Sequence, residues 1–374
     1  MGKKILMIAG EASGDLHGAS LVKALKARDP ELELFGVGGE KMKAEGFEAL
    51  FHINQMAFLG FIEVVKHLPY IMKVQKALID EALRRGVKTV VLIDYPGFNL
   101  NIAKKFKKLG IRVVYYIAPQ IWAWGEGRVK KLKERTDIVL SVFPFEEKFF
   151  KEHGVKVDFV GNPLAERIAG YSFMPEAEFR AKWGLDPDKK ILAVLPGSRI
   201  HEVELLLKPA LEAAEILEKE FGFQTVVGCA DTIDEEFIRK IKTGGYKLIK
   251  GYQFEIKKYA DFGIVKSGTS TMEAALLDMP LVIIYKTSAL TYNIGKRLIK
   301  IGNLGMVNII AEETIAPELI QDEVTGEKIA ATATRILKDP SLLKKQTDGF
   351  ARIKENLGKH KASATAAGII LNEA

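Results

Sequence analysis

Hydroxyl, guanidinium and carboxylate side chains gather in two Gly-containing segments, and each segment follows an apolar, strand-like run. In the first, VLPGSRIHEVELLL (194–207), Pro196 and Gly197 turn the chain before an amphipathic helix that we expect to begin near Ser198. The free amides of a helix start, the Ser198 hydroxyl and the Arg199 guanidinium together suit a phosphate-bearing ligand. The alternative is that Ser198 only caps the helix and Arg199 is a solvated surface charge.

The second segment is VKSGTSTMEAALLDMP (265–280), in which Gly268 permits close approach to the backbone. Glu273 follows about one helical turn into the next helix, where its carboxylate could accept both hydroxyls of a ribose whose diphosphate lies on the helix N-terminus. The alternative is an ordinary capping box. Two anion-binding turns in one half of the chain point to a nucleoside diphosphate. The predicted contacts are Ser198, Arg199, Glu202, Lys266, Ser267, Gly268, Thr269, Ser270 and Glu273.

An acid in the N-terminal half also follows a strand-like run, because Asp94 ends the apolar letters of VLIDYPGFNLNIAKK. An acid at the carboxyl end of a parallel strand faces the ligand-binding edge of the sheet, which makes Asp94 the best candidate for a general base. The alternative is an Asx-turn before Pro96. The chain has neither a Walker loop nor GxGxxG, and the glycines of AGEASGDLHGAS (9–20) recur every four residues, so a nicotinamide cofactor is not expected.

Three further stretches have both a functional and a structural interpretation. Trp122 and Trp124 follow a strand and could line a sugar site or pack under the next helix. Residues 54–78 are crowded with apolar side chains and interspersed lysines, which fits either core burial or docking onto a membrane surface or acyl chain. The DPD at 186–188 resembles a metal-binding motif but precedes a strand, so we interpret it as a turn and expect no metal.

Composition places the chain among ordinary globular proteins. It has 374 residues, 48% of them apolar and 28% charged, and a net charge of +7 that gives little support for nucleic-acid binding. One cysteine, Cys229, fits a reducing compartment. The apolar run near the start is too short for a signal sequence or a membrane span, so we expect a cytoplasmic protein.

Continuous apolar strands alternate with helical stretches in two series, which predicts two doubly wound, Rossmann-like parallel sheets of the α/β class facing a central cleft. The predicted domains are 1–165 and 180–357, joined by a linker at 166–179. The C-terminal helix, about 358–374, is expected to pack back on the first domain. After residue 315 the pattern is helical to the end.

Taken together, the motifs resemble those of lipid-A-disaccharide synthases, which are GT-B glycosyltransferases. The resemblance runs essentially from end to end, with small departures at Gly97 and Lys266. It is carried by AGEASGDLHGA, GVGGEKMKAEGFE, LGFIEV, LIDYPGFN, YYIAPQIWAW, GNPL, LPGSR..EV and SGTSTMEAAL.

The resemblance implies inverting transfer of 2,3-diacylglucosamine from UDP to the 6-hydroxyl of 2,3-diacylglucosamine 1-phosphate, at the cytoplasmic face of the inner membrane. It also implies catalytic roles for Asp94, Arg199, Asn308 and Gln321. Members of the family form domain-swapped homodimers, so the resemblance implies a homodimer as well. Asp15 is our second choice for the base, and Ser13 with Gly14 is expected to form a tight turn that positions substrate. The membrane contact is expected through residues 54–78.

Two other functions fit parts of the pattern. Another UDP-sugar enzyme of the same fold, such as a UDP-N-acetylglucosamine 2-epimerase or a transferase with a soluble acceptor, would share the turn containing Glu273 but needs no exposed apolar segment. A two-domain binding protein of the periplasmic type would share the two-sheet architecture. The latter is disfavoured by the two adjacent anion-binding turns and by the absence of a leader pattern.

Overall fold

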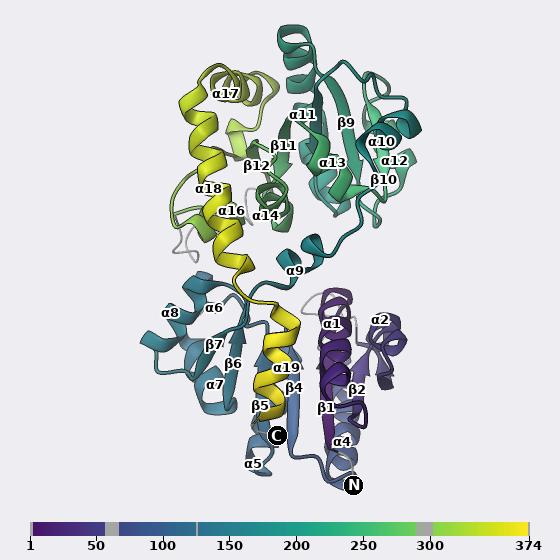
Figure 1. Ribbon diagram of the computed structural model, residues 1–374, viewed down its shortest axis with the longest axis vertical. Helices are drawn as coiled ribbons and strands as arrows, with labels where there is room; N and C mark the ends of the chain where they lie inside the picture. Colours follow the sequence, from purple (N-terminus) through teal and green to yellow (C-terminus); the bar gives the residue numbers. More distant parts are fainter. Residues whose placement is uncertain (1–2, 57–66, 125, 289–291, 293–301, 373–374) are drawn as a thin grey trace. The chain divides into compact units, whose positions relative to one another are not determined.

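The computed structural model describes residues 3–56, 67–124, 126–288, 292 and 302–372. The chain forms two compact units, one of residues 1–166 with 357–374 and the other of residues 167–356 (Figure 1). Each unit is built on one parallel sheet. Among the described residues, no helix combines the length and the apolar character needed to cross a membrane.

The first unit has a seven-stranded sheet with the order β3-β2-β1-β4-β5-β6-β7. The chain starts at β1, moves outward to β3, and returns to add β4 on the other side of β1, so the β1/β4 boundary is the topological switch point. The strands are β1 (Lys4–Ala9), β2 (Glu33–Gly38), β3 (Glu48–His52), β4 (Thr89–Ile93), β5 (Arg112–Tyr116), β6 (Ile138–Ser141) and β7 (Val157–Phe159).

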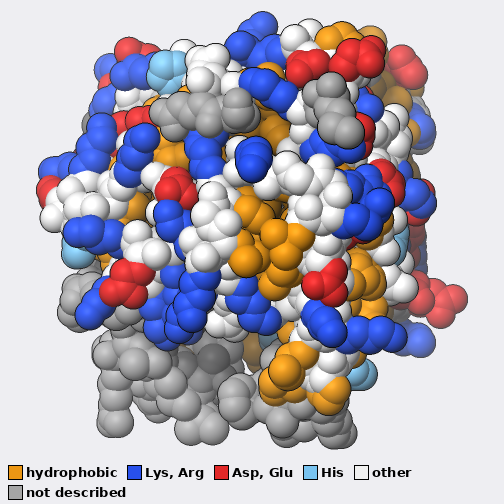
Figure 2. Space-filling view, turned by 90° about the horizontal axis from the view of Figure 1, so that it is seen from below, with side chains coloured by type: hydrophobic (Ala, Val, Ile, Leu, Met, Phe, Trp, Pro, Cys, Tyr) orange, Lys and Arg blue, Asp and Glu red, His pale blue; other side chains and the backbone are white. Residues whose placement is uncertain are grey.

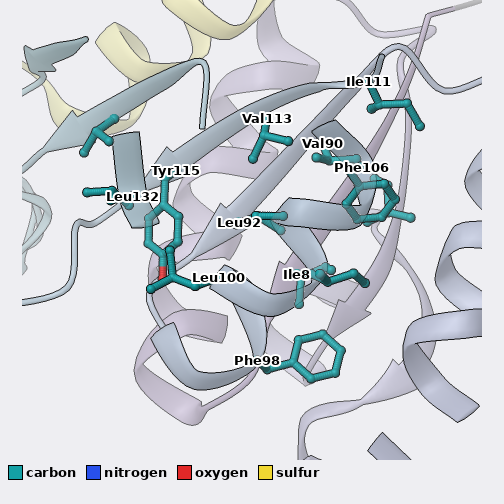
Figure 3. Packing of buried hydrophobic residues seen from close by; sticks show 14 of the residues in the cluster. Ile8, Val90, Leu92, Phe98, Leu100, Phe106, Ile111, Val113, Tyr115 and Leu132 are labelled. Atoms are coloured by element: carbon teal, nitrogen blue, oxygen red, sulfur yellow. The ribbon is translucent and has the colours of Figure 1, made fainter. Parts of the chain in front are cut away.

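Alternation along these strands divides the core of the first unit into two layers, as period-two geometry requires. One layer joins Leu92, Val113 and Tyr115 to helices α4, α5 and α7 (Figure 3). The other face carries α1 and the C-terminal α19, which pack against each other. The helices are α1 (Ala12–Arg28), α2 (Glu40–Ala44), α4 (Leu68–Arg84), α5 (Pro96–Lys108), α6 (Ile121–Trp124), α7 (Glu126–Arg135), α8 (Pro144–Glu152), α9 (Pro163–Ala169) and α19 (Ala362–Asn372), with a 3₁₀ turn at Ile53–Gln55.

The second unit has a six-stranded sheet with the order β10-β9-β8-β11-β12-β13, and its switch point lies between β8 and β11. The strands are β8 (Ile191–Leu195), β9 (Gln224–Cys229), β10 (Lys247–Lys250), β11 (Phe262–Lys266), β12 (Leu281–Tyr285) and β13 (Glu318–Ile320). The helices are α10 (Glu176–Trp183), α11 (Ile200–Phe221), α12 (Glu235–Ile241), α13 (Gln253–Tyr259), α14 (Thr269–Leu276), α16 (Met306–Ala311), α17 (Gly326–Lys338) and α18 (Pro340–Gly358), with a 3₁₀ turn at Gln321–Glu323.

The expectation of helix throughout the region after residue 315 is wrong at β13, a three-residue strand that pairs with β12. Such a short strand shows no alternation that a sequence pattern could detect. Residues 166–179 contain the end of α9 and the start of α10, and the Tyr171 hydroxyl between them donates to Glu255 at 2.9 Å. This stretch is therefore packed against the second unit rather than extended.

The C-terminal helix α19 belongs to the first unit and is fixed there by polar contacts as well as by its apolar face. Its first turn is held by Glu166, which accepts hydrogen bonds from the Ser363 amide at 2.9 Å and the Ser363 hydroxyl at 2.6 Å. Arg28 and Arg112 donate to the helix carbonyls of Ala364 and Ile370. The first unit is thus built from both ends of the chain.

Candidate active site

The switch point of the first sheet brings two acids together at the carboxyl ends of β1 and β4. Asp94 directly follows β4, as its position in the sequence predicts, and Glu11 follows β1 after Gly10. Glu11 was not among the predicted site residues, although the same strand-end argument that selects Asp94 applies to it. The edge of an open α/β sheet at its switch point is where ligands of this architecture bind.

Asp94 has an unusual backbone and an unusual carboxyl group. Asp94 and Tyr95 both have positive φ, 46° and 49°, a region that residues with a Cβ seldom occupy. Burial raises the pKa of Asp94 to about 6, and the negative charge of Glu11 adds to the rise. A carboxyl group with a pKa near neutrality and a partly open position suits general-base chemistry.

Asp15 lies in α1 and is almost fully buried. Its Oδ1 accepts hydrogen bonds from the backbone amides of Gly39 at 2.7 Å and Met42 at 3.1 Å, and its Oδ2 accepts one from Lys41 at 3.1 Å. These are the free amides at the start of α2, so Asp15 anchors that helix to α1. This geometry favours Asp94 over Asp15 as the base.

The glycines of the first segment are explained by close packing. A Cβ on Gly10 would lie 2.2 Å from the Tyr95 ring, and one on Gly18 would lie 2.5 Å from the sulfur of Met42 in α2. Ser13 and Gly14 lie in the first turn of α1, so the expected tight turn is wrong, and Ser13 is exposed there.

The two phosphate-type turns of the second unit lie side by side, because β8 and β11 are neighbours at the switch point of the second sheet. The turn after β8 carries Ser198 and Arg199, and the turn after β11 carries Ser267 and Gly268. Helix α11 begins at Ile200 with Arg199 as its N-cap, so the alternative that Ser198 caps this helix is wrong. The Arg199 side chain is 68% exposed and thus open to a ligand.

Glu202 joins the two turns. Its Oε1 lies 2.9 Å from Nη1 of Arg199 and 2.9 Å from Nζ of Lys266, while its Oε2 accepts the Ser198 amide at 3.2 Å. Burial acts to raise the pKa of Glu202, but the hydrogen bonds and charges of Lys266 and Arg199 hold it below its ordinary value. A Cβ on Gly197 would lie 2.6 Å from Oε2 of Glu202, so only glycine leaves room for this carboxylate.

The start of α14 offers amides and hydroxyls of the kind that bind phosphate. Gly268 is the N-cap with φ 148°, Thr269 is exposed and Ser270 is half-buried. The buried Ser267 hydroxyl donates to the Leu304 carbonyl at 2.8 Å, so this side chain supports the turn. The Thr271 hydroxyl donates back to the Gly268 carbonyl at 2.8 Å.

Glu273 forms an ion pair rather than a capping box. Its Oε2 lies 3.0 Å from Nζ of Lys257, a lysine that is 1% exposed on α13. The ion pair holds the carboxylate of Glu273 one turn into α14, where the sequence predicts it to meet a ribose. Lys257 gave no sequence signal, since a lysine in a polar helix is ordinarily taken for a solvated charge.

Asn308 and Gln321 are engaged in hydrogen bonds within the second unit. The Asn308 side chain donates to the Ala316 carbonyl at 2.8 Å and to Glu318 at 2.7 Å, and accepts the amides of Ile315 and Ala316. Gln321 accepts the Thr287 amide at 2.8 Å and donates to the Thr287 carbonyl at 3.0 Å. Both side chains therefore hold the loops beyond β12 and around β13.

A buried acid, Glu146, contacts the aromatic segment after β5 and was not predicted from the sequence. Trp122 donates its indole N–H to Glu146 Oε1 at 3.0 Å and packs edge-on against Phe145. Burial raises the pKa of Glu146 to about 8, although hydrogen bonds from Trp122 and from backbone amides act to lower it. The side chain of Trp124 lies outside the described residues.

The remaining sequence features have separate locations. Asp186 and Asp188 form a turn before β8, in which the Asp188 amide donates to Asp186 at 2.9 Å, as expected of a turn. No group of three or more potential metal ligands occurs in the part of the chain that the structure describes. Residues 57–66 of the apolar segment lie outside the described residues, and the rest continues into α4, where Leu68 is 44% and Met72 60% exposed.

The architecture is that of GT-B glycosyltransferases. A glycosyltransferase of kitacinnamycin superimposes with a TM-score of 0.68 at 12% identity, covering 100% of this chain and 99% of the other. The calicheamicin glycosyltransferase CalG4 gives 0.63 at 14% identity, with coverage of 99% and 97%. The UDP-GlcNAc 2-epimerase of Neisseria meningitidis, bound to UDP-GlcNAc, gives 0.63 at 12% identity and covers 99% of both chains. At these identities the likeness shows the fold.

Sequence relatives define the family. The lipid-A-disaccharide synthetase family model matches residues 5–370. The lipid-A-disaccharide synthase of Geobacter metallireducens is 41% identical over 99% of this chain and 97% of its own length. That of Myxococcus xanthus is 39% identical over 98% and 97%, and that of Pseudomonas aeruginosa 38% over 99% and 98%. The chain belongs to the lipid-A-disaccharide synthetase family and is a glycosyltransferase.

Proposed function

We propose that this protein transfers 2,3-diacylglucosamine from its UDP derivative to the 6-hydroxyl of 2,3-diacylglucosamine 1-phosphate, with UDP and the β-1,6-linked disaccharide 1-phosphate as products. Family membership gives the reaction. The observation in the structure that supports it best is the arrangement of Arg199, Glu202 and Lys266, which places two cations and two helix starts at one sheet edge. That arrangement suits a diphosphate leaving group.

The reaction is a single displacement with one base. The carboxylate of Asp94 accepts the proton of the acceptor 6-hydroxyl while that oxygen bonds to the anomeric carbon. The bond from this carbon to the diphosphate oxygen breaks at the same time, and its electron pair leaves with UDP. Inversion at carbon follows from attack on the face opposite UDP.

Charge on the departing UDP is met by Arg199, by Lys266 and by the N-termini of α11 and α14. Removing one preorganised donor of this kind typically costs about 3 kcal/mol in the transition state, or ~100-fold in rate. We propose that these groups take the place of a divalent cation, so that the reaction needs no metal. Turnover that persists in excess EDTA would support this part of the proposal.

Both substrates carry acyl chains, and α4 presents an apolar surface that suits them. Leu68 and Met72 are exposed beside Lys73 and Lys76. The face in Figure 2 shows apolar side chains among many Lys and Arg side chains. Exposed apolar groups beside lysines favour an anionic lipid surface. We propose that the protein binds the cytoplasmic face of the inner membrane through residues 54–78, and that it forms homodimers. We propose no nucleic-acid partner.

One assay tests the function: UDP release from the diacylated donor, measured with and without the lipid monosaccharide phosphate. The proposal requires that UDP release depends on the acceptor and that a disaccharide 1-phosphate accumulates in equal amount. An epimerase would release UDP, or convert UDP-N-acetylglucosamine, without any acceptor. Equal activity on a water-soluble acceptor in the absence of detergent would favour a different transferase.

A further inference from the structure

Two fully buried side chains hold the backbone carbonyl of Asp94. The Tyr115 hydroxyl on β5 donates to this oxygen at 2.7 Å, and Nδ2 of Asn99 on α5 donates to it at 2.7 Å. Asn99 Nδ2 also donates to the Ile93 carbonyl at 3.2 Å. A carbonyl oxygen only accepts hydrogen bonds, so the Asn99 amide must turn its Nδ2, and not its Oδ1, toward these two carbonyls.

These contacts fall on a stretch of backbone with an unfavourable conformation. Asp94 and Tyr95 are consecutive residues with positive φ, and such a pair relaxes to an ordinary turn unless its surroundings hold it. The carbonyl carbon and Cβ of Asp94 are bonded to the same Cα. Two donors on the carbonyl hold the backbone at Asp94, and the backbone in turn sets the direction of the Cα–Cβ bond that carries the carboxylate.

The Tyr95 side chain is also held in place by two contacts. Its hydroxyl donates to the Met56 carbonyl at 2.8 Å, and its ring fills the space left by the missing side chain of Gly10. The peptide that joins Asp94 to Tyr95 is therefore fixed by Asn99 and Tyr115 on its carbonyl and by the Tyr95 ring beyond it.

We propose that Tyr115 and Asn99 are positioning residues of the transfer reaction, which hold the Asp94 carboxylate in the direction required for it to receive the acceptor proton. The inference rests on the proposed role of Asp94 as the base. Neither side chain touches substrate, and both act through the Asp94 backbone. Oδ1 of Asn99 is buried without a hydrogen-bond partner among the described residues, so the hydrogen bonds that hold this side chain in place are those of its Nδ2.

The chain supplies a matched control on the same strand. Tyr116 is as fully buried as Tyr115, but its side chain points to the opposite face of the sheet, and its hydroxyl has no hydrogen-bond partner in the described part of the chain. Figure 3 shows the Tyr115 ring on the α5 side, beside Leu100. Tyr115→Phe and Tyr116→Phe thus delete the same atom from adjacent residues, and only the first deletion reaches Asp94.

The experiment compares kcat, KM for the donor and thermal unfolding for Tyr115→Phe, Asn99→Ala, their double variant and Tyr116→Phe. We expect Tyr115→Phe and Asn99→Ala each to lower kcat about 10- to 100-fold, with KM within twofold, because small misplacements of a reacting group have effects of this size. The double variant should lose less than the product of the two, since both donors serve one oxygen. Tyr116→Phe should keep the kcat of the parent protein.

The pH profile of kcat separates positioning from general loss of stability. The ionisable groups around Asp94 are Glu11, whose charge raises its pKa, together with Tyr115 and Glu146. Without these donors the Asp94 carboxylate can move toward solvent, which reduces the burial that raises its pKa. The pKa of Asp94 should therefore fall, and the acid limb of kcat should move to lower pH in Tyr115→Phe and Asn99→Ala. Tyr116→Phe should leave the limb in place.

Asp94→Asn keeps the two proposals distinguishable. If Asp94→Asn is inactive while Tyr115→Phe and Asn99→Ala keep the parent kcat and acid limb, the positioning role is overturned and Asp94 remains the base. Equal losses in Tyr115→Phe and Tyr116→Phe would overturn it as well, because they would reflect packing alone. Turnover by Asp94→Asn would instead remove the proposed function of Asp94 itself. Tyr115→Phe conserves the ring and its volume, so it decides the matter even if Asn99→Ala proves too unstable to assay.

Discussion

Lys266 at the end of β11 and Glu202 in the first turn of α11 form a 2.9 Å ion pair that links the two turns of the second unit. Arg199 lies on the same carboxylate oxygen at 2.9 Å. Two cations therefore share one anion, so these three side chains together carry a net charge of +1 at the start of two helices. Positive charge that is in place before the ligand arrives stabilises a diphosphate as it leaves.

Replacing either cation should weaken both UDP binding and turnover. We expect Arg199→Ala and Lys266→Ala each to lower kcat/KM by about 100-fold, the effect of losing one preorganised donor. Steady-state kinetics and UDP titration measure this. Lys240→Ala is the control, because Lys240 is an exposed lysine of α12 in the same unit. UDP affinity equal to that of the parent protein in Arg199→Ala would count against the assignment of the nucleotide to these turns.

Asp94→Asn should abolish turnover and yet stabilise the protein at pH 7. The pKa of Asp94 is raised by burial from its ordinary value to about 6, so the folded protein favours the neutral carboxyl group. That preference stabilises the fold fully below the ordinary pKa and is lost as pH rises through about 6. The asparagine avoids the loss, on the order of 3 kcal/mol. Thermal unfolding from pH 4 to 8 should show the gain only at the upper end, and kcat of the parent protein should fall below pH 6 as the base becomes protonated.

Asp15→Ala should damage stability rather than chemistry. The variant leaves three amides at the start of α2 without their acceptor, and hydrogen bonds to a charged group contribute about 1.5–3 kcal/mol each. We expect a lower unfolding temperature and, at a temperature where the variant is folded, kcat within a few-fold of the parent value. A folded Asp15→Ala protein without turnover would return Asp15 to consideration as the base.

Glu273→Gln should distinguish recognition of the ribose from recognition of the diphosphate. The carboxylate is held by the buried Lys257 at 3.0 Å, and we expect its loss to weaken UDP binding by about tenfold, as the removal of a charged hydrogen-bond acceptor does. Inhibition by inorganic pyrophosphate, which has no ribose, should be unchanged. Parallel loss of both ligands would show that Glu273 supports the turn and does not contact the sugar.

The strand-end argument predicted where the candidate site residues lie within each sheet, whereas the contacts among them could not be predicted. Asp94, Arg199 and Lys266 were selected because each follows an apolar run, and the two sheets place all three at switch-point edges. That Glu202 joins Arg199 to Lys266 depends on the pairing of β8 with β11, in which paired residues such as Leu192 and Phe262 lie 70 positions apart in the chain. No local pattern carries information over that separation.

Asp15 makes a set of structural contacts that the sequence did not predict. Its partners lie 24 to 27 residues away at a helix of five residues, too short to give a periodic signal. Asn308 and Gln321 are similar, because their polar atoms are engaged within the second unit. Glu11 and Lys257 were missed because an exposed glutamate and a helix lysine are ordinarily solvated.

The packing of α19 on α1 has a consequence for how the two units depend on chain connectivity. Residues 167–356 form the second unit from one continuous stretch, whereas the first unit needs two stretches of the chain that lie on either side of the second. A cut between α18 and α19 would therefore leave the second unit whole and separate the first unit from the helix that covers α1.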